Sequence, residues 1–168
     1  MASKHGPNRF DNYQSVHETR MQHLIDSGFV LVDTTEFLPN RGAILLVGAI
    51  HCLGGIYIDV IKTLAILDED GPDATVQTES YSYNVTLKGV GNIFRYDSPH
   101  VAPGEKDFIQ HHNYHHKHVY DVLNGDKHGH TVLIEREDDI PTLGEVIEEA
   151  AEWYYNHLES LSKPTPPA

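Results

Sequence analysis

The sequence of 168 residues contains only one cysteine, Cys52. A single cysteine excludes an internal disulfide and any zinc site built from several cysteines. The sequence also lacks a long apolar run, because glycine and charged residues interrupt its most apolar stretch, residues 43–67. A membrane helix needs about 20 consecutive apolar residues. The N-terminus has no basic start followed by an apolar segment, as a signal peptide would. We therefore expect a cytoplasmic protein that does not span a membrane.

Basic residues are scarce: the sequence has 12 Lys and Arg residues against 25 Asp and Glu residues, which gives a net charge of −13. The excess is uneven: residues 1–87 and 131–168 are both acidic, whereas residues 88–130 carry five basic and five acidic side chains. This charge disfavours broad nucleic-acid binding, which depends on a basic surface. The neutral segment holds eight of the 13 histidines, so it becomes positive when several of them protonate. It remains compatible with a compact site for one phosphate.

Two long runs rich in β-branched residues, 43–53 and 56–67, are separated by Gly54-Gly55. Two glycines between such runs predict a tight hairpin, because the favoured turns require positive φ. In the second run every other residue is apolar except Lys62, as in an antiparallel strand with one face on a core. Further strand signals lie at residues 29–32, 81–87, 92–97 and 131–134.

Helix signals occur near both ends of the chain. Ser15 and Glu18 have the spacing of a capping box, and Thr142 and Glu145 repeat it before the clearest apolar stripe in the sequence. Together with the strand signals, they predict an α+β fold: an antiparallel β-sheet of about five or six strands packed with a C-terminal helix and a short N-terminal helix.

The length fits one domain with its own core. We expect a loose N-terminal arm at residues 1–14, where no periodic pattern is present. A single α+β domain should then occupy residues 15–161. Residues 162–168 are rich in proline and predict a tail.

The eight histidines between His100 and His130 are the main functional signal, because histidine is neither a strong strand former nor a preferred core residue. In a strand, His116 and His118 would share one face and Lys117 would point to the other. A His-x-His pair can give two imidazole ligands to a divalent ion such as Zn²⁺ or Ni²⁺. A third ligand from His100 or His112 would leave one coordination position open.

The same residues also fit metal-free acid–base chemistry. Cleavage of an RNA phosphodiester needs a base and an acid, and His116 and His118 could supply both at pH 7, each contributing roughly 10²–10⁴ in rate. Arg95 or Lys117 would stabilise the pentavalent phosphorane, and Asp97 could fix a histidine tautomer. This reaction requires no cofactor.

A third interpretation is a solvated polar loop or a partner-binding surface. We prefer it for His111, His128 and His130. If it extends to the whole histidine segment, the protein is a non-catalytic module that binds a metal or a partner.

Three motifs follow one another in the sequence: Arg95-Tyr96-Asp97, His115-His116-Lys117-His118 and the helix start Pro-Thr-Leu-Gly-Glu at Pro141. Their order resembles that in the TumE-type toxins of bacterial toxin–antitoxin systems. The resemblance covers roughly residues 43–153. Tyr114 stands where the family usually has a proline, and the loop before it is longer than usual.

The resemblance implies a toxin component that a cognate antitoxin neutralises, with RNA as the substrate and a homodimer as one compatible assembly. The resemblance assigns the functional site to the residues of the first two motifs, Arg95-Tyr96-Asp97 and His115-His116-Lys117-His118. The ribonuclease hypothesis thus places five residues in a catalytic site: His116, His118, Asp97, Arg95 and Lys117.

Overall fold

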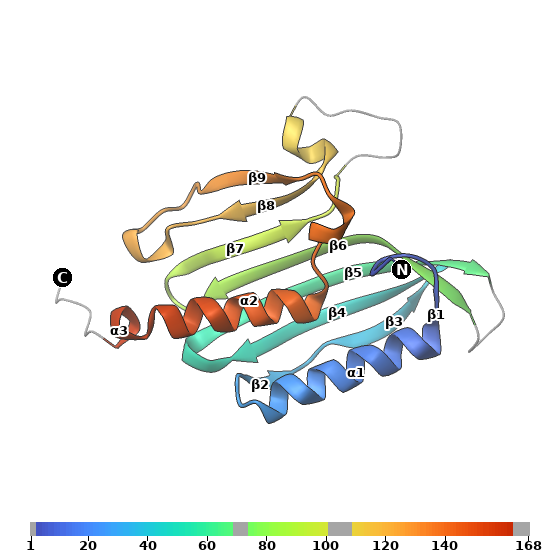
Figure 1. Ribbon diagram of the computed structural model, residues 1–168, viewed down its shortest axis with the longest axis horizontal. Helices are drawn as coiled ribbons and strands as arrows, with labels where there is room; N and C mark the ends of the chain where they lie inside the picture. The colour runs from blue at the N-terminus through green and yellow to red at the C-terminus, as the bar shows by residue number, and fades with distance from the viewer. Residues whose placement is uncertain (1–2, 69–73, 101–108, 163–168) are drawn as a thin grey trace.

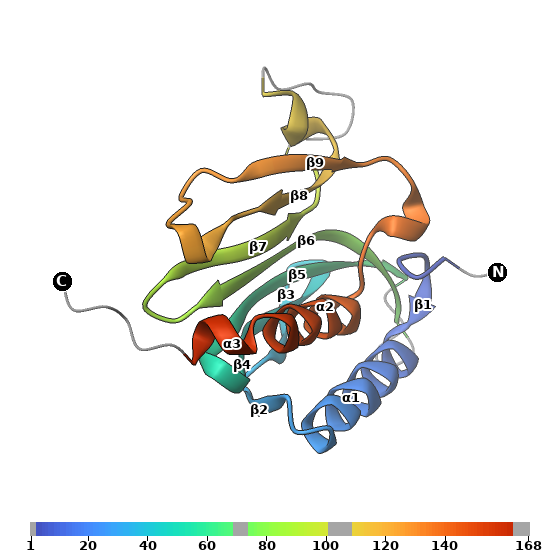
Figure 2. The same ribbon diagram turned by 60° about the vertical axis from the view of Figure 1, so that its left-hand side comes forward.

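The computed structural model of the chain describes residues 3–68, 74–100 and 109–162. Its centre is one antiparallel sheet in the order β2-β4-β5-β6-β7-β8-β9, with β1 beside β6 and β3 beside β4 (Figure 1). Helices α1 (Phe10–Asp26) and α2 (Leu143–Asn156) both lie on one face of this sheet (Figures 1 and 2), and the short α3 (Leu158–Leu161) follows α2. The strands are β1 (Asn8–Arg9), β2 (Val30–Asp33), β3 (Glu36–Asn40), β4 (Ala43–Cys52), β5 (Ile56–Asp68), β6 (Thr75–Leu87), β7 (Gly91–Asp97), β8 (His115–Val119) and β9 (His130–Ile134).

The predicted α+β class is confirmed, with more strands than expected. β4 and β5 form the predicted hairpin, and they pair antiparallel over nine positions, from Ala43↔Ala65 to His51↔Tyr57. Gly54 and Gly55 make the turn with φ of 71° and 77°, a conformation that residues with a Cβ rarely adopt.

The core lies between the sheet and the two helices. From β5, Ile56, Ile58, Val60 and Leu64 are almost fully buried, as the alternating pattern predicted. From α2, the buried side chains are Leu143, Val146, Ile147 and Ala150. Burial of such side chains stabilises a fold by about 25 cal/mol per Å² of apolar surface. Lys62 points to this same face and is only 3% exposed.

The prediction of a loose arm over residues 1–14 is wrong for the part that the structure describes. β1 pairs with the first two residues of β6, Thr75 and Val76, and α1 begins at Phe10 instead of at the capping box. The amide of Phe10 donates to the carbonyl of Ala74, and its ring packs edge-on against Phe37 at 5.3 Å between centroids. These tertiary contacts start the helix five residues before Ser15.

At the other end, α2 begins where the sequence indicated. The Thr142 hydroxyl accepts a hydrogen bond from the amide of Glu145 at 3.2 Å. Ser162 ends α3, and the rest of the expected Pro-rich tail, residues 163–168, lies outside the described residues. Among the described helices, none has the length and apolar character needed to cross a membrane.

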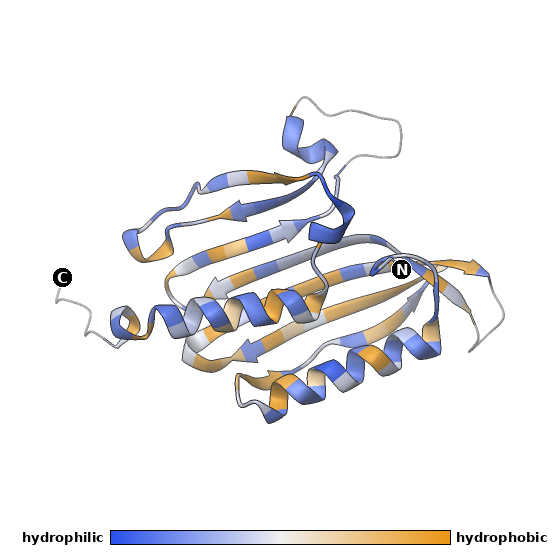
Figure 3. Ribbon diagram, in the orientation of Figure 1, coloured by the Kyte–Doolittle hydropathy of each residue, from blue (hydrophilic) through white to orange (hydrophobic). Residues whose placement is uncertain are grey.

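The second face of the sheet, opposite α1 and α2, is the open face. On β5 it presents Asp59 and Ile61, and Ile61 is 59% exposed. Hydropathy changes across the sheet, since β4 is mostly apolar and β8 mostly polar (Figure 3). The open face at β7 and β8 is where the histidines gather.

Candidate functional site

Strand pairing places four of the predicted site residues on the open face. β7 and β8 are antiparallel neighbours, with Asp97 opposite His116 and Arg95 opposite His118. Directly opposed residues in such a pair project to the same side of the sheet. The register alone therefore brings the carboxylate, the guanidinium and two imidazoles together.

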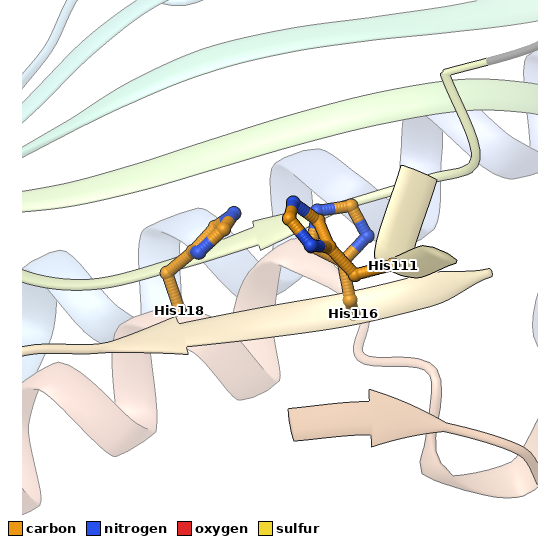
Figure 4. A group of neighbouring side chains, drawn as sticks. All are labelled: His111, His116 and His118. Carbon is orange, nitrogen blue, oxygen red and sulfur yellow. The ribbon is translucent and has the colours of Figure 1, made fainter. Parts of the chain in front are cut away.

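A 3-10 turn, η3 (Gln110–Asn113), leads into β8 and adds His111 and His112. The amide of His100 donates to the carbonyl of His112 at 2.8 Å, which joins the end of the β7 segment to this turn. The histidine cluster then consists of His100, His111, His112, His116 and His118. Within it, the ring of His111 lies 4.9 Å from that of His116 and 5.4 Å from that of His118, between centroids (Figure 4).

His116 is the most enclosed member, with no exposed side-chain surface. Its Nδ1 lies 2.8 Å from the carbonyl oxygen of Tyr114. A carbonyl oxygen only accepts hydrogen bonds, so Nδ1 carries a proton and donates it. The neutral ring then has its lone pair on Nε2. This Nε2 is buried and has no hydrogen-bond partner among the described residues.

Asp97 is only 2% exposed and lies at the centre of the charged groups. The Nε of Arg95 donates to Oδ1 of Asp97 at 3.0 Å. Oδ2 is 2.8 Å from the same nitrogen, but no described donor has the geometry of a hydrogen bond to it. Oδ2 also lies 3.9 Å from Nε2 of His116 and 3.9 Å from Nε2 of His118.

The environment favours the neutral form of two imidazoles in the cluster, those of His118 and His100. Burial lowers the pKa of His118, and the neighbouring His116 lowers it further, while Asp97 opposes the shift. Burial likewise lowers the pKa of His100. The Nδ1 of His118 is 3.2 Å from the Thr131 hydroxyl, an outer partner of the kind that fixes the tautomer of a ligating histidine. Neutral imidazole is the form that binds metals.

Two groups of ligand atoms are close enough together to hold a metal ion. One consists of His111, His116 and His118, and the other of Asp97, His100 and His116; within each group the atoms lie within 4.8 Å of one another. Tetrahedral zinc with Zn–N bonds of about 2.0–2.1 Å separates its ligand nitrogens by roughly 3.4 Å. Small ring rotations would therefore close either group around an ion.

The predicted site residues divide between the two faces. Arg95, Asp97, His116 and His118 come together as expected, and His100 joins them. Lys117 does not, because alternation along β8 turns it toward α2, where its ammonium forms an ion pair with Glu149. Its Nζ also lies over the Phe94 ring, 4.8 Å from the centroid.

The three histidines that we expected in a solvated loop or a partner-binding surface differ in their surroundings. His128 and His130 are exposed, and His130 is the first residue of β9. His111 lies in η3 and is partly buried, and one of its ring nitrogens belongs to one of the two groups. His112, the alternative third ligand, instead stacks on His100 at 4.6 Å between ring centroids. The position of His111 just before β8 was a sequence signal that it could join the cluster. The sequence did not specify the turn η3, which brings His111 back toward His116 and His118.

No protein-family model matches this chain. Comparisons with curated proteins and with solved structures found no significant match either.

Proposed function

We propose that the histidine cluster binds one divalent transition-metal ion, Zn²⁺ or Ni²⁺, through His111, His116 and His118. The observation that carries this proposal is the buried Nε2 of His116, which has no described hydrogen-bond partner while other imidazoles surround it. A buried polar atom without a partner is costly. A metal ion would remove that cost, and its affinity for imidazole nitrogen suits the ligand set.

The arrangement supports hydrolysis as the chemistry. Three protein ligands leave a fourth position open for water, and a zinc ion lowers the pKa of bound water to about 7. Arg95, whose side chain is 40% exposed, lies opposite His118 in the strand pairing and would orient an anionic substrate. We therefore propose a metal-dependent hydrolase acting on a phosphate ester, with the RNA phosphodiester as the leading substrate class.

The second candidate is the metal-free ribonuclease of a toxin–antitoxin module. This candidate is supported by the position of Arg95 and Asp97 beside His118 and His100. Both histidine side chains are partly exposed, and that of His100 is more exposed than that of His118. Because His116 is fully buried, His118 and His100 would be the acid–base pair that reaches a substrate. The toxin role, the cognate antitoxin and a homodimer remain predictions from the family resemblance.

Calorimetry on the full chain tests metal binding. Protein freed of metal with a chelator should take up one Zn²⁺ per chain. His111→Ala and His118→Ala should each weaken binding at least about tenfold, and His128→Ala, an exposed control outside the cluster, should leave it unchanged. Absence of binding, or equal affinity in all four proteins, would overturn the proposal.

An RNA-cleavage assay with and without chelator separates the two candidates. Cleavage that stops with chelator and returns with Zn²⁺ supports the hydrolase. Cleavage that resists chelator and is lost in His118→Ala supports the metal-free ribonuclease. If neither condition gives cleavage while zinc still binds, the cluster is a non-catalytic metal site.

A further inference from the structure

A pocket of about 230 Å³ lies on the helix-covered face of the sheet, between α1, the start of α2 and β5. Lys4, Arg20 and Lys62 are among the residues that line it, and no acidic residue is. This is unusual for a chain with a net charge of −13. The pocket opens on the face opposite the histidine cluster, so any ligand here would be independent of the proposed metal.

Lys62 is the residue of this pocket that most strongly indicates an anionic ligand. It occupies a position in β5 where the pattern calls for an apolar side chain, and it is only 3% exposed. Its ammonium lies over the Tyr13 ring, 5.2 Å from the centroid. It makes no hydrogen bond or ion pair with any residue in the described ranges. Burial lowers the pKa of Lys62 to about 8. A buried cation without a counter-ion is expensive.

The start of α2 contributes further donors to the same space. The first amides of a helix have no acceptor within the helix, and the positive end of its dipole favours anions. Arg20 donates from Nη1 to the Thr142 hydroxyl at 2.9 Å, which fixes its guanidinium beside this end. Gly144 permits that approach, because a Cβ at this position would lie 2.1 Å from Cδ of Arg20.

One cation at this pocket is already neutralised. Lys4 forms an ion pair with Glu145 at 2.9 Å, and both side chains are partly exposed. The donors left for a ligand are therefore the ammonium of Lys62, the guanidinium of Arg20 and the amides of Leu143 and Gly144, since the amide of Glu145 already donates to Thr142. They approach from a strand, from one helix and from the end of another.

We infer that this pocket binds a small phosphate-type oxyanion, free or as the head of a small phosphorylated compound, held between Lys62, Arg20 and the N-terminus of α2. A tetrahedral oxyanion accepts hydrogen bonds from several directions, as these donors require. The pocket volume of about 230 Å³ accommodates such a group. The ligand supplies the counter-ion that Lys62 lacks.

Inorganic phosphate is the probe for this site. Titration calorimetry and thermal unfolding should show saturable binding and a higher melting temperature in phosphate than in sodium chloride of equal ionic strength. Lys62→Met should weaken phosphate binding at least about tenfold, the loss of one charge-assisted contact. Arg20→Gln should weaken it in the same direction, and Lys88→Met, at an exposed lysine, should not.

The outcome is independent of the metal proposal, because His118→Ala should retain the full response to phosphate. Two results would overturn the inference: a wild-type protein that responds equally to phosphate and chloride, or a Lys62→Met variant with unchanged phosphate affinity. If Lys62→Met misfolds, the Arg20→Gln titration decides in its place, since Arg20 is on the surface of α1.

Discussion

Nε2 of His116 and Oδ2 of Asp97 lie 3.9 Å apart. Both atoms are buried, and neither has a hydrogen-bond partner among the described residues. With the Nδ1 proton of His116 donated to Tyr114, the two atoms direct lone pairs into the same space. Two acceptors facing each other are unfavourable unless a cation lies between or beside them. Arg95 supplies such a cation to Oδ2, because its Nε lies 2.8 Å away, whereas Nε2 of His116 has no described hydrogen-bond partner. The unpartnered Nε2 of His116 therefore marks the centre of the proposed site.

Asp97→Asn tests this relationship. The substitution keeps the shape of the side chain but removes the charge that supports the metal and its ligands, so we expect zinc affinity to fall about 10–100-fold. Calorimetry on chelator-treated protein measures it, and circular dichroism verifies the fold. Asp121→Asn, at an exposed aspartate, is the matched control. An Asp97→Asn variant with wild-type zinc affinity would remove Asp97 from the site.

Lys117 allows a second test, because the structure gives it a role in packing and the family resemblance gives it a role in catalysis. Its ammonium pairs with Glu149 of α2, which also accepts a hydrogen bond from the Tyr96 hydroxyl at 2.8 Å. Lys117→Met should therefore cost about 1–3 kcal/mol of unfolding free energy. It should leave zinc affinity unchanged.

Urea unfolding of Lys117→Met, Glu149→Gln and the double variant measures the coupling between the two side chains. The double variant should lose less than the two single losses combined. The same proteins belong in the RNA-cleavage assay. Full stability combined with lost cleavage in Lys117→Met would restore the catalytic role and contradict the packing role.

Much of the fold followed from local patterns in the sequence. The alternation in β5 and the glycine pair before it predicted a hairpin, because period and turn chemistry are both encoded in neighbouring residues. The cap at Thr142 located the start of α2 for the same reason. The start of α1 was not predicted, because it depends on contacts of Phe10 with Phe37 in β3 and with Ala74, which precedes β6, and both lie far along the chain.

The site was predictable only in part, for a related reason. His116 and His118 share a face of β8 because side chains alternate along a strand, and the sequence alone predicted this. The register between β7 and β8, which puts Asp97 beside His116, is a long-range property. So is the turn that returns His111 to the cluster. Lys117 was placed in the catalytic set because a cation was needed beside the phosphate and because it belongs to the motif, although the alternation already turned it to the other face.

The pH dependence of stability provides a third prediction, away from the histidine cluster. Burial lowers the pKa of His17 on α1, and the nearby Asp33 only partly opposes this. Between the lowered folded pKa and the ordinary value of 6.5, the unfolded chain binds more protons than the folded one. Stability is therefore present above pH 6.5 and falls as the pH decreases through this window.

His17→Gln should flatten that decline. Urea unfolding at pH 7.5 and 5.5, with chelator and without phosphate, gives the change in unfolding free energy for each protein. The matched control is His23→Gln, an exposed histidine on the same helix, which should keep the wild-type decline. An identical decline in His17→Gln would show that His17 does not contribute to it.

Lys62 gives the fourth prediction, which concerns its cost to the fold. Its pKa is about 8 in the folded protein against an ordinary 10.5. Between these values the unfolded chain keeps a proton that the folded chain loses, so stability rises with pH across this window. At pH 7 the buried ammonium then costs at most roughly 3 kcal/mol, the free-energy equivalent of that pKa difference.

Lys62→Met removes this cost while keeping a side chain of similar length. In chloride buffer at pH 7 the variant should be more stable than the wild type, and its advantage should shrink by pH 9.5, where the wild-type lysine is largely neutral. Lys88→Met should show neither effect. Chemical unfolding at the two pH values decides the matter. If Lys62→Met loses stability equally at both, the contact with Tyr13 and the surrounding packing outweigh desolvation, and Lys62 belongs to the core for structural reasons alone.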